Sequence, residues 1–183
     1  MGNTRYGEWR VVGFMPTATI IDVRRQGDGS VQGDGDGWVF DADGQRYWGR
    51  HGAAGLLLTA ATDDGVAVLL QHRAIWSHQG GTWGLPGGAR DSHETVEQAA
   101  VREAFEEAGI SGDELDVVDA VVTHSASSGW TYTTVLAQAA SLLATTPNGE
   151  STELRWVPIA KVAELPLHPG LAAAWPGLVD RLG

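Results

Sequence analysis

The stretch GGARDSHETVEQAAVREAFEEAGI, residues 87–110, joins a glycine pair to a helix with marked ends and several glutamates. Thr95 suits the N-cap of that helix, and Gln98 three residues later completes a capping box. Gly109 suits the position just past the C-terminus, where the backbone turns left-handed. The stretch therefore predicts a helix from about Val96 to Ala108.

The two faces of this helix differ in character when side chains are placed at about 100° per residue. Val101, Ala104, Phe105 and Ala108 form an apolar stripe. A stripe of this kind faces the core in most surface helices of globular proteins. We therefore expect all four side chains to be turned toward a sheet.

Three glutamates share one fan beside that stripe, because Glu103, Glu106 and Glu107 are spaced i, i+3 and i+4. Like charges at this spacing destabilise a helix by roughly 0.2–0.5 kcal/mol per pair. A divalent cation among the carboxylates removes the repulsion, and Mg²⁺ prefers oxygen ligands. From the spacing alone, a solvated acidic helix face stays open as the alternative. The glycines of GLPGG, residues 84–88, favour a metal site because a backbone carbonyl can approach a cation there.

The stretch resembles the signature of the Nudix family. That signature, the Nudix box, is written G-x5-E-x7-R-E-U-x-E-E-x-G-U, where U is a bulky aliphatic residue. The lead-in WGLPGG, residues 83–88, also looks like the usual Nudix sequence. The one departure is Ala104 in place of a larger aliphatic residue. The fixed positions are occupied by Gly88, Glu94, Arg102, Glu103, Glu106, Glu107, Gly109 and Ile110.

The resemblance implies a hydrolase that cleaves the pyrophosphate bond of a nucleoside diphosphate linked to another moiety. Glu103, Glu106 and Glu107 would be catalytic residues and ligands of Mg²⁺, with Mn²⁺ as the alternative ion. The Gly87 carbonyl would be a further ligand. A role of Glu103 as general base is the alternative to metal ligation.

Two further residues of the box are expected to have supporting roles. By resemblance, Glu94 and Arg102 hold the loop and the helix together through polar contacts, outside the metal ligands themselves. An exposed helix arginine without such a role is the alternative for Arg102.

Candidate residues outside the box follow from their positions near strand ends. Glu150 and Glu153 precede or begin a predicted strand and are candidate metal ligands, with a charged loop as the alternative. Arg73 ends a predicted strand and is a candidate phosphate or ribose contact. Trp130 and Tyr132 alternate along one strand face and are candidate substrate contacts by base stacking. Core packing is the alternative for both aromatic residues.

The substrate is predicted only by exclusion. The region after the box reads HSASSG, residues 124–129, without the proline that often marks ADP-ribose hydrolases. The remaining resemblance is to the group that hydrolyses (d)NTPs, including oxidised ones. A Nudix-fold module that binds a nucleotide or regulates a partner without turnover is the alternative function.

Composition limits the partners. The 183 residues carry a net charge of −11 and no cysteine, so disulfides and thiolate–metal sites are excluded. An acidic chain is a poor binder of a nucleic acid duplex. No apolar run reaches the roughly 20 residues of a membrane span, and we expect a cytoplasmic protein acting on a small nucleotide. A homodimer is an open alternative.

The expected fold is α/β, a Nudix-type α/β/α sandwich with a mixed sheet flanked by helices. Residues 1–50 are expected to form an N-terminal extension with a Gly/Asp-rich loop at 24–37, and residues 51–183 the Nudix hydrolase domain. Loop structure is expected at 78–88. Strands are expected at 18–23, 54–60, 66–74, 115–124, 130–140 and 153–159, a hairpin at 38–48, and short helices at 159–164 and 169–181.

Overall fold

Two long apolar strands, β3 (Ala53–Thr62) and β4 (Gly65–Arg73), form the centre of the sheet. The computed structural model describes residues 33–77 and 79–182. Within them β3 is buried from Ala53 to Ala60, as its uninterrupted run of small and aliphatic side chains predicts. The strand expected at 18–23 lies outside the described residues.

The sheet is mixed, with the strand order β5-β4-β3-β8-β7. β5 (Trp83–Gly84) and β7 (Asp116–Ser125) stand at the two ends of this order, and β8 (Thr131–Ala139) lies between β3 and β7. β8 runs parallel to β3, and the other pairs are antiparallel. β6 (Gly87–Ala89) pairs with the first residues of β3, and β9 (Ser151–Pro158) pairs with β4.

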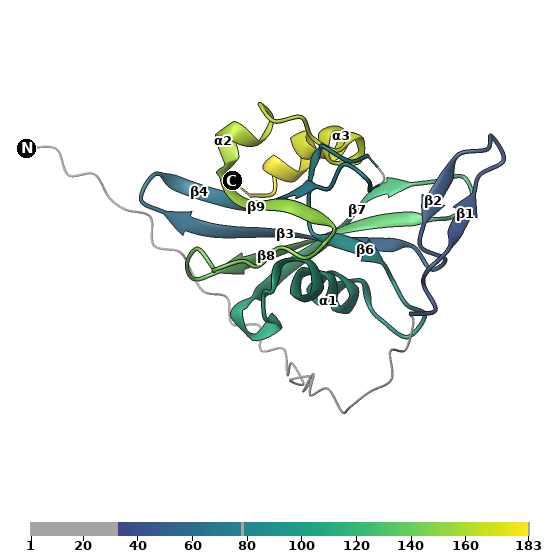
Figure 1. Cartoon of the computed structure of the whole chain (residues 1–183), viewed down its shortest axis with the longest axis horizontal. Helices are drawn as coiled ribbons and strands as arrows, with labels where there is room; N and C mark the ends of the chain where they lie inside the picture. Colours follow the sequence, from purple (N-terminus) through teal and green to yellow (C-terminus); the bar gives the residue numbers. More distant parts are fainter. Residues whose placement is uncertain (1–32, 78, 183) are drawn as a thin grey trace, which may run out of the picture. The chain divides into compact units, whose positions relative to one another are not determined.

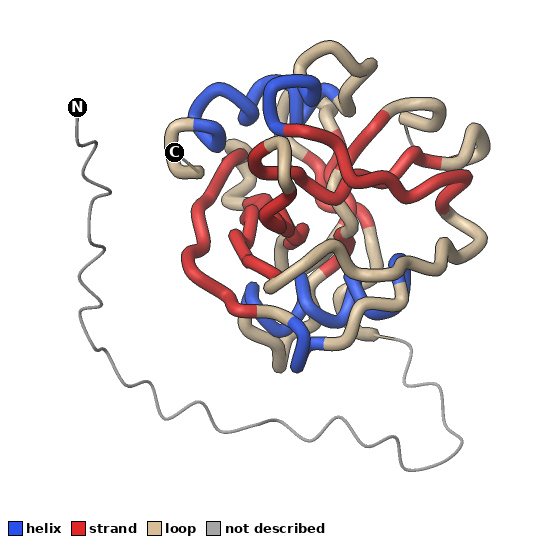
Figure 2. The backbone as a smooth tube through the Cα atoms, turned by 90° about the vertical axis from the view of Figure 1, so that its left-hand side faces the viewer, coloured by secondary structure: helices blue, strands red, loops and turns tan. Residues whose placement is uncertain are grey.

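Helices cover both faces of this sheet (Figure 1). Leu56 and Leu58 of β3 lie in one apolar cluster with the alanines of α1 (Val96–Ala108). Leu57 points to the opposite face and lies in a second cluster with Trp175 of α3 (Pro169–Val179). Figure 2 shows the same layering, with helices on opposite sides of the strands. The predicted α/β sandwich with a mixed sheet is therefore confirmed.

The two remaining helices are short. α2 (Ile159–Val162) follows β9 directly and places Val162 in the same cluster as Trp175. The 3-10 helix η1 (Gly112–Glu114) connects α1 to β7. No helix within the described residues is both long enough and apolar enough to cross a membrane.

α1 has the ends predicted from sequence. Thr95 and Gln98 form the capping box, and Gly109 is left-handed with φ 72°. The predicted apolar stripe is wrong in one member, because Phe105 is 49% exposed while Glu107 is only 4% exposed. The buried face carries alanines, which let the helix approach the sheet closely and leave no room for a phenyl ring. Glu107 is thereby turned inward.

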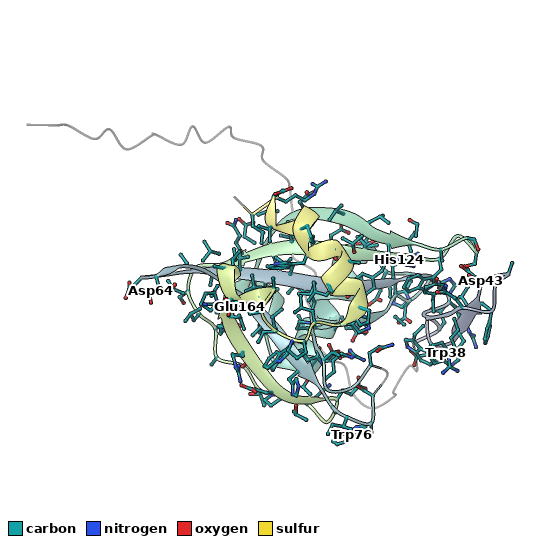
Figure 3. All side chains as sticks on the ribbon, turned by 90° about the horizontal axis from the view of Figure 1, so that it is seen from above. Trp38, Asp43, Asp64, Trp76, His124 and Glu164 are labelled. Carbon is teal, nitrogen blue, oxygen red and sulfur yellow. The ribbon has the colours of Figure 1, made fainter. Side chains whose placement is uncertain are left out.

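The hairpin predicted at 38–48 is present as β1 (Trp38–Phe40) and β2 (Arg46–Trp48), with Gly44 at φ 84° in its turn. Asp41 accepts N–H bonds from Ser127 and Ser128, which ties the hairpin to the β7–β8 turn. Trp38 and Asp43 accordingly lie at the same end of the molecule as His124, opposite Asp64 (Figure 3).

One sequence prediction needs correction here. The loop expected at 78–88 contains the short strands β5 and β6. They pair through their backbones with β4 and β3, and a glycine-rich sequence does not predict such pairing. The described residues 33–37 of the loop expected at 24–37 are neither helix nor strand, and Gly35 there is buried and donates its N–H to Asp91 Oδ1 at 2.8 Å.

Candidate active site

The carboxyl group of Glu107 lies in the interior, at the last turn of α1. Its Oε2 accepts the N–H of Gly87 at 2.7 Å, which joins the helix to β6. Burial raises the pKa of Glu107 to about 7, and the charge of Glu103 acts in the same direction, against the Gly87 bond. A buried carboxylate of this kind favours a cation as its partner.

Glu103 lies one turn earlier and faces the second glycine of the pair. A Cβ at Gly88 would come within 2.5 Å of Glu103 Oε1, so this carboxyl group occupies the space that any other residue would fill. Burial raises the pKa of Glu103 to about 7, although Arg102 pulls it downward. Its side chain is 13% exposed, whereas that of Glu106 is 48% exposed at the rim.

Arg102 connects the loop after β6 to the helix. Its guanidinium makes a bidentate pair with Glu94 at 2.7 and 3.0 Å, and donates to the Ala89 carbonyl at 2.9 Å. Nη1 also contacts Glu103 at 2.8 Å and Glu106 at 3.4 Å. These bonds raise the pKa of Arg102, the Glu94 bond most. Burial would raise the pKa of Glu94, but the Arg102 and Asp91 bonds hold it below its ordinary value.

The two candidate ligands outside the box, Glu150 and Glu153, have different environments. The negative charge of Glu150 contributes to the raised pKa values of both Glu103 and Glu107. Glu153 instead forms an ion pair with Arg155, and its side chain is 43% exposed. The charge effect of Glu150 and the pairing of Glu153 with Arg155 favour Glu150 over Glu153 as the additional ligand.

Tyr132 lies beside the glycines of the site, and the charges of Arg73 and Glu107 act on it. The Tyr132 hydroxyl is so close to Gly55 and Gly87 that a Cβ at Gly55 would clash with it. Burial raises the pKa of Tyr132, and Glu107 adds to this, while the charge of Arg73 lowers it. Arg73 thus brings positive charge to the acidic group.

Trp130 lies farther out. Its ring stacks on Tyr47 at 4.8 Å, and its Nε1 donates to the Gly49 carbonyl at 2.9 Å. These contacts use one ring face and the only polar atom of the indole for packing the hairpin onto β8. They support the packing role of Trp130 rather than base stacking.

Two residues near Glu107 were not among the sequence candidates. Gln71 is fully buried on β4, and its Nε2 donates to Ser151 Oγ at 2.8 Å. A hydrogen bond from Gln71 also acts on the Glu107 carboxyl group. The available signal was a glutamine interrupting the apolar run VAVLL of residues 66–70.

A separate polar group lies where the described chain begins. Ligand atoms of Asp34, Asp91 and His93 lie within 4.8 Å of one another. The two carboxylates already accept backbone N–H groups from Ser92 and Gly35. Their contacts explain how residues 33–35 are held against the loop after β6.

The site therefore combines four carboxylates with two glycines of β6. Because Glu107 is buried, Glu103 is largely buried and Glu150 adds a third negative charge, these carboxylates repel one another unless protons or cations intervene. Oxygen donors with high negative charge density match the preference of Mg²⁺ and Mn²⁺. The residues present fit a divalent cation with an anionic, phosphate-bearing ligand.

Comparison with known proteins gives a consistent result. The family model described as NUDIX domain matches residues 49–176. A Mycobacterium tuberculosis protein provisionally named 8-oxo-dGTP diphosphatase 3 is 65% identical over 150 residues, which cover 79% of this chain and 69% of the relative. A Bifidobacterium longum protein named nucleoside triphosphate pyrophosphatase/Nudix hydrolase fusion protein is 40% identical over 161 residues, 84% of this chain and 33% of the relative.

A solved structure agrees as well. The crystal structure of a Nudix hydrolase from M. smegmatis, RenU, is 61% identical in sequence and superposes with a TM-score of 0.78. The match covers 81% of this chain and 95% of that chain. Both the fold and the sequence of residues 49–176 are thus shared with proteins of one family.

Proposed function

The chain belongs to the Nudix family as a pyrophosphohydrolase, and from that premise we propose that it hydrolyses the pyrophosphate bond of (d)NTPs, oxidised ones included, with Mg²⁺. The observation that carries this proposal is the arrangement of Glu103 and Glu107. Glu107 is buried and Glu103 is largely buried beside Gly87 and Gly88, and their pKa values are raised to about 7.

The residues of the chain divide the work. Glu103, Glu106, Glu107 and Glu150 would hold the metal, with the Gly87 carbonyl as a further ligand. When bound, Mg²⁺ neutralises phosphate oxygens and lowers the pKa of the attacking water. Mn²⁺ is the alternative ion, because it accepts the same oxygen ligands.

Other residues position these groups. Arg102 fixes Glu103 relative to Glu94 and the Ala89 carbonyl, so that the helix and the loop after β6 keep one arrangement. Arg73 would supply a positive charge for the phosphate chain, and the Tyr132 hydroxyl lies beside Gly87. Trp130 is assigned to packing.

The substrate class rests on the relatives. The M. tuberculosis protein carries the name of an 8-oxo-dGTP diphosphatase, and it shares 65% of its aligned residues with this chain. We therefore place oxidised purine deoxynucleoside triphosphates first among candidate substrates, with ordinary (d)NTPs second. The products would be a nucleoside monophosphate and pyrophosphate.

A nucleotide panel tests this proposal. Purified full-length protein is incubated with Mg²⁺ or Mn²⁺ and with dGTP, 8-oxo-dGTP, other (d)NTPs and dinucleoside polyphosphates, and products are identified by mass. Hydrolysis in ¹⁸O-labelled water shows which phosphorus is attacked. We expect a nucleoside monophosphate from 8-oxo-dGTP at the highest kcat/KM. Absence of turnover for every compound, in a protein that still binds nucleotide, would contradict hydrolysis and support a binding module.

Matched variants test the residues. Glu107→Gln and Glu106→Gln keep the shape of each side chain and remove its charge. Each is expected to lower kcat by a factor of about 10²–10⁴, since metal and charge stabilisation supply several kcal/mol of the barrier reduction. Glu153→Gln is the matched control and should retain activity, because Glu153 is paired with Arg155 at the surface. Unchanged turnover in Glu107→Gln would remove Glu107 from the metal site.

A further inference from the structure

Gln71 is an unusual residue for its position. It lies on β4 between Gly84 of β5 and Leu154 of β9, and none of its surface is exposed. Leu69, two residues earlier on the same strand face, packs in the apolar cluster under α1. An aliphatic side chain would fill the site of Gln71 without any polar group to satisfy.

The amide of Gln71 is satisfied on one side only. Its Nε2 donates to Ser151 Oγ at 2.8 Å, and hydrogen bonding from the same side chain lowers the pKa of the Glu107 carboxyl group. Its Oε1 is buried and has no hydrogen-bond partner among the described residues. An unpaired buried carbonyl lowers the stability of the folded protein. This orientation of the amide therefore makes the native state less stable than an apolar side chain would.

Through Ser151 and through its effect on Glu107, Gln71 acts on the two elements that carry the acidic residues. Glu107 is on α1, and Ser151 begins β9 directly after Glu150. Glu150 and Glu107 repel each other, since the charge of Glu150 raises the pKa of Glu107. The Gln71 amide therefore bridges two segments whose charges push them apart. Reversing the amide would set a carbonyl oxygen against the Glu107 carboxylate and add a third repulsive group.

We propose that Gln71, held by Ser151, is a positioning residue that fixes the Glu107 carboxylate relative to Glu150 and thereby sets the affinity of the site for a divalent cation. The inference rests on the proposed function, in which Glu107 and Glu150 are metal ligands. Supporting hydrogen bonds to ligands typically change metal affinity by about 10–100-fold when removed.

Mn²⁺ binding and thermal unfolding together test the role. Gln71→Met has nearly the same length and no polar atoms, and Gln138→Met, at an exposed position of β8, is the matched control. Free Mn²⁺ is titrated into the full-length proteins and measured by electron paramagnetic resonance, and melting temperatures are recorded in EDTA. We expect at least tenfold weaker Mn²⁺ binding for Gln71→Met, with a melting temperature equal to or above that of the wild type, because the unpaired oxygen is gone.

Ser151→Ala is an independent test of the same hydrogen bond. It replaces Gln71→Met in the Mn²⁺ measurement if Gln71→Met does not fold. It should weaken Mn²⁺ binding by a smaller factor, and the double variant should bind no more weakly than Gln71→Met alone, because the two residues act as a unit. Wild-type affinity in Gln71→Met or Ser151→Ala would overturn the inference. So would a loss of affinity matched by a large fall in melting temperature, which would show a merely structural role. Failure of the wild type itself to bind Mn²⁺ would instead refute the proposed metal site.

Discussion

The raised pKa of Glu107 makes a prediction about stability in the absence of metal. The folded protein holds the Glu107 proton up to pH about 7, whereas an unfolded chain releases it near the ordinary value of 4.5. Between these values the native state binds more protons than the unfolded state, so stability falls as pH rises. The metal-free protein should therefore be more stable at pH 5 than at pH 8.

The magnitude follows from the two pKa values. The difference between about 7 and 4.5 corresponds to up to about 3 kcal/mol, at about 1.4 kcal/mol per pH unit. Glu107→Gln stays neutral at every pH and keeps an oxygen that accepts the Gly87 N–H. In EDTA at pH 8 this variant should be the more stable protein by up to about 3 kcal/mol, or a melting temperature higher by about 6–12 °C. At pH 5 the two proteins should differ little.

Thermal unfolding followed by circular dichroism at pH 5 and pH 8 is the assay. Glu106→Gln is the control, because the 48% exposed Glu106 side chain keeps most of its hydration and its replacement should change little. Adding Mg²⁺ at pH 8 should stabilise the wild type more than Glu107→Gln. A Glu107→Gln variant that melts at or below the wild type in EDTA at pH 8 would refute the reasoning, as would an equal difference at both pH values.

Three further substitutions test neighbouring parts of the site. Arg102→Leu should lower the free energy of unfolding by about 1–3 kcal/mol, measured by denaturant titration, because it leaves the largely buried Glu94 without its partner; a loss below 1 kcal/mol would contradict this. Gly88→Ala should weaken Mn²⁺ binding at least tenfold, since the added methyl group meets the Glu103 carboxylate; wild-type affinity would argue against the close approach. Trp130→Phe should cost about 1 kcal/mol through the lost bond to Gly49 while leaving KM unchanged, and a raised KM would restore Trp130 as a substrate contact.

Much of the fold was predictable because local signals and packing agree. The cap residues Thr95 and Gly109 mark the ends of α1 where the structure has them. The apolar runs that form β3 and β4 are long enough to identify buried strands. The short strands β5 and β6 were not predictable, since two or three residues rich in glycine become strands only through pairing with β4 and β3.

The candidate site was also predictable only in part. Spacing on one helix brings Glu103, Glu106 and Glu107 to neighbouring positions, and the sequence alone shows this. How deep each carboxyl group lies depends on how closely α1 approaches the sheet, and the misassigned Phe105 shows that the helix is rotated from the predicted face. The contacts of Gln71 and Ser151 join residues 80 positions apart, which no local pattern reveals.

The close contact between Gly55 and Tyr132 has an evolutionary consequence. A Cβ at position 55 would collide with the Tyr132 hydroxyl, and would still lie 3.0 Å from Cζ if the hydroxyl were lost. Alanine at 55 is therefore accessible only after Tyr132 has been replaced by a smaller residue, so the order of the two mutations matters. Gly55 also pairs with Gly87 in the β3–β6 register, so the dependence between positions 55 and 132 also affects the glycine segment of the site. Lineages that differ at position 132 would start with different sets of tolerated substitutions around the same carboxylates.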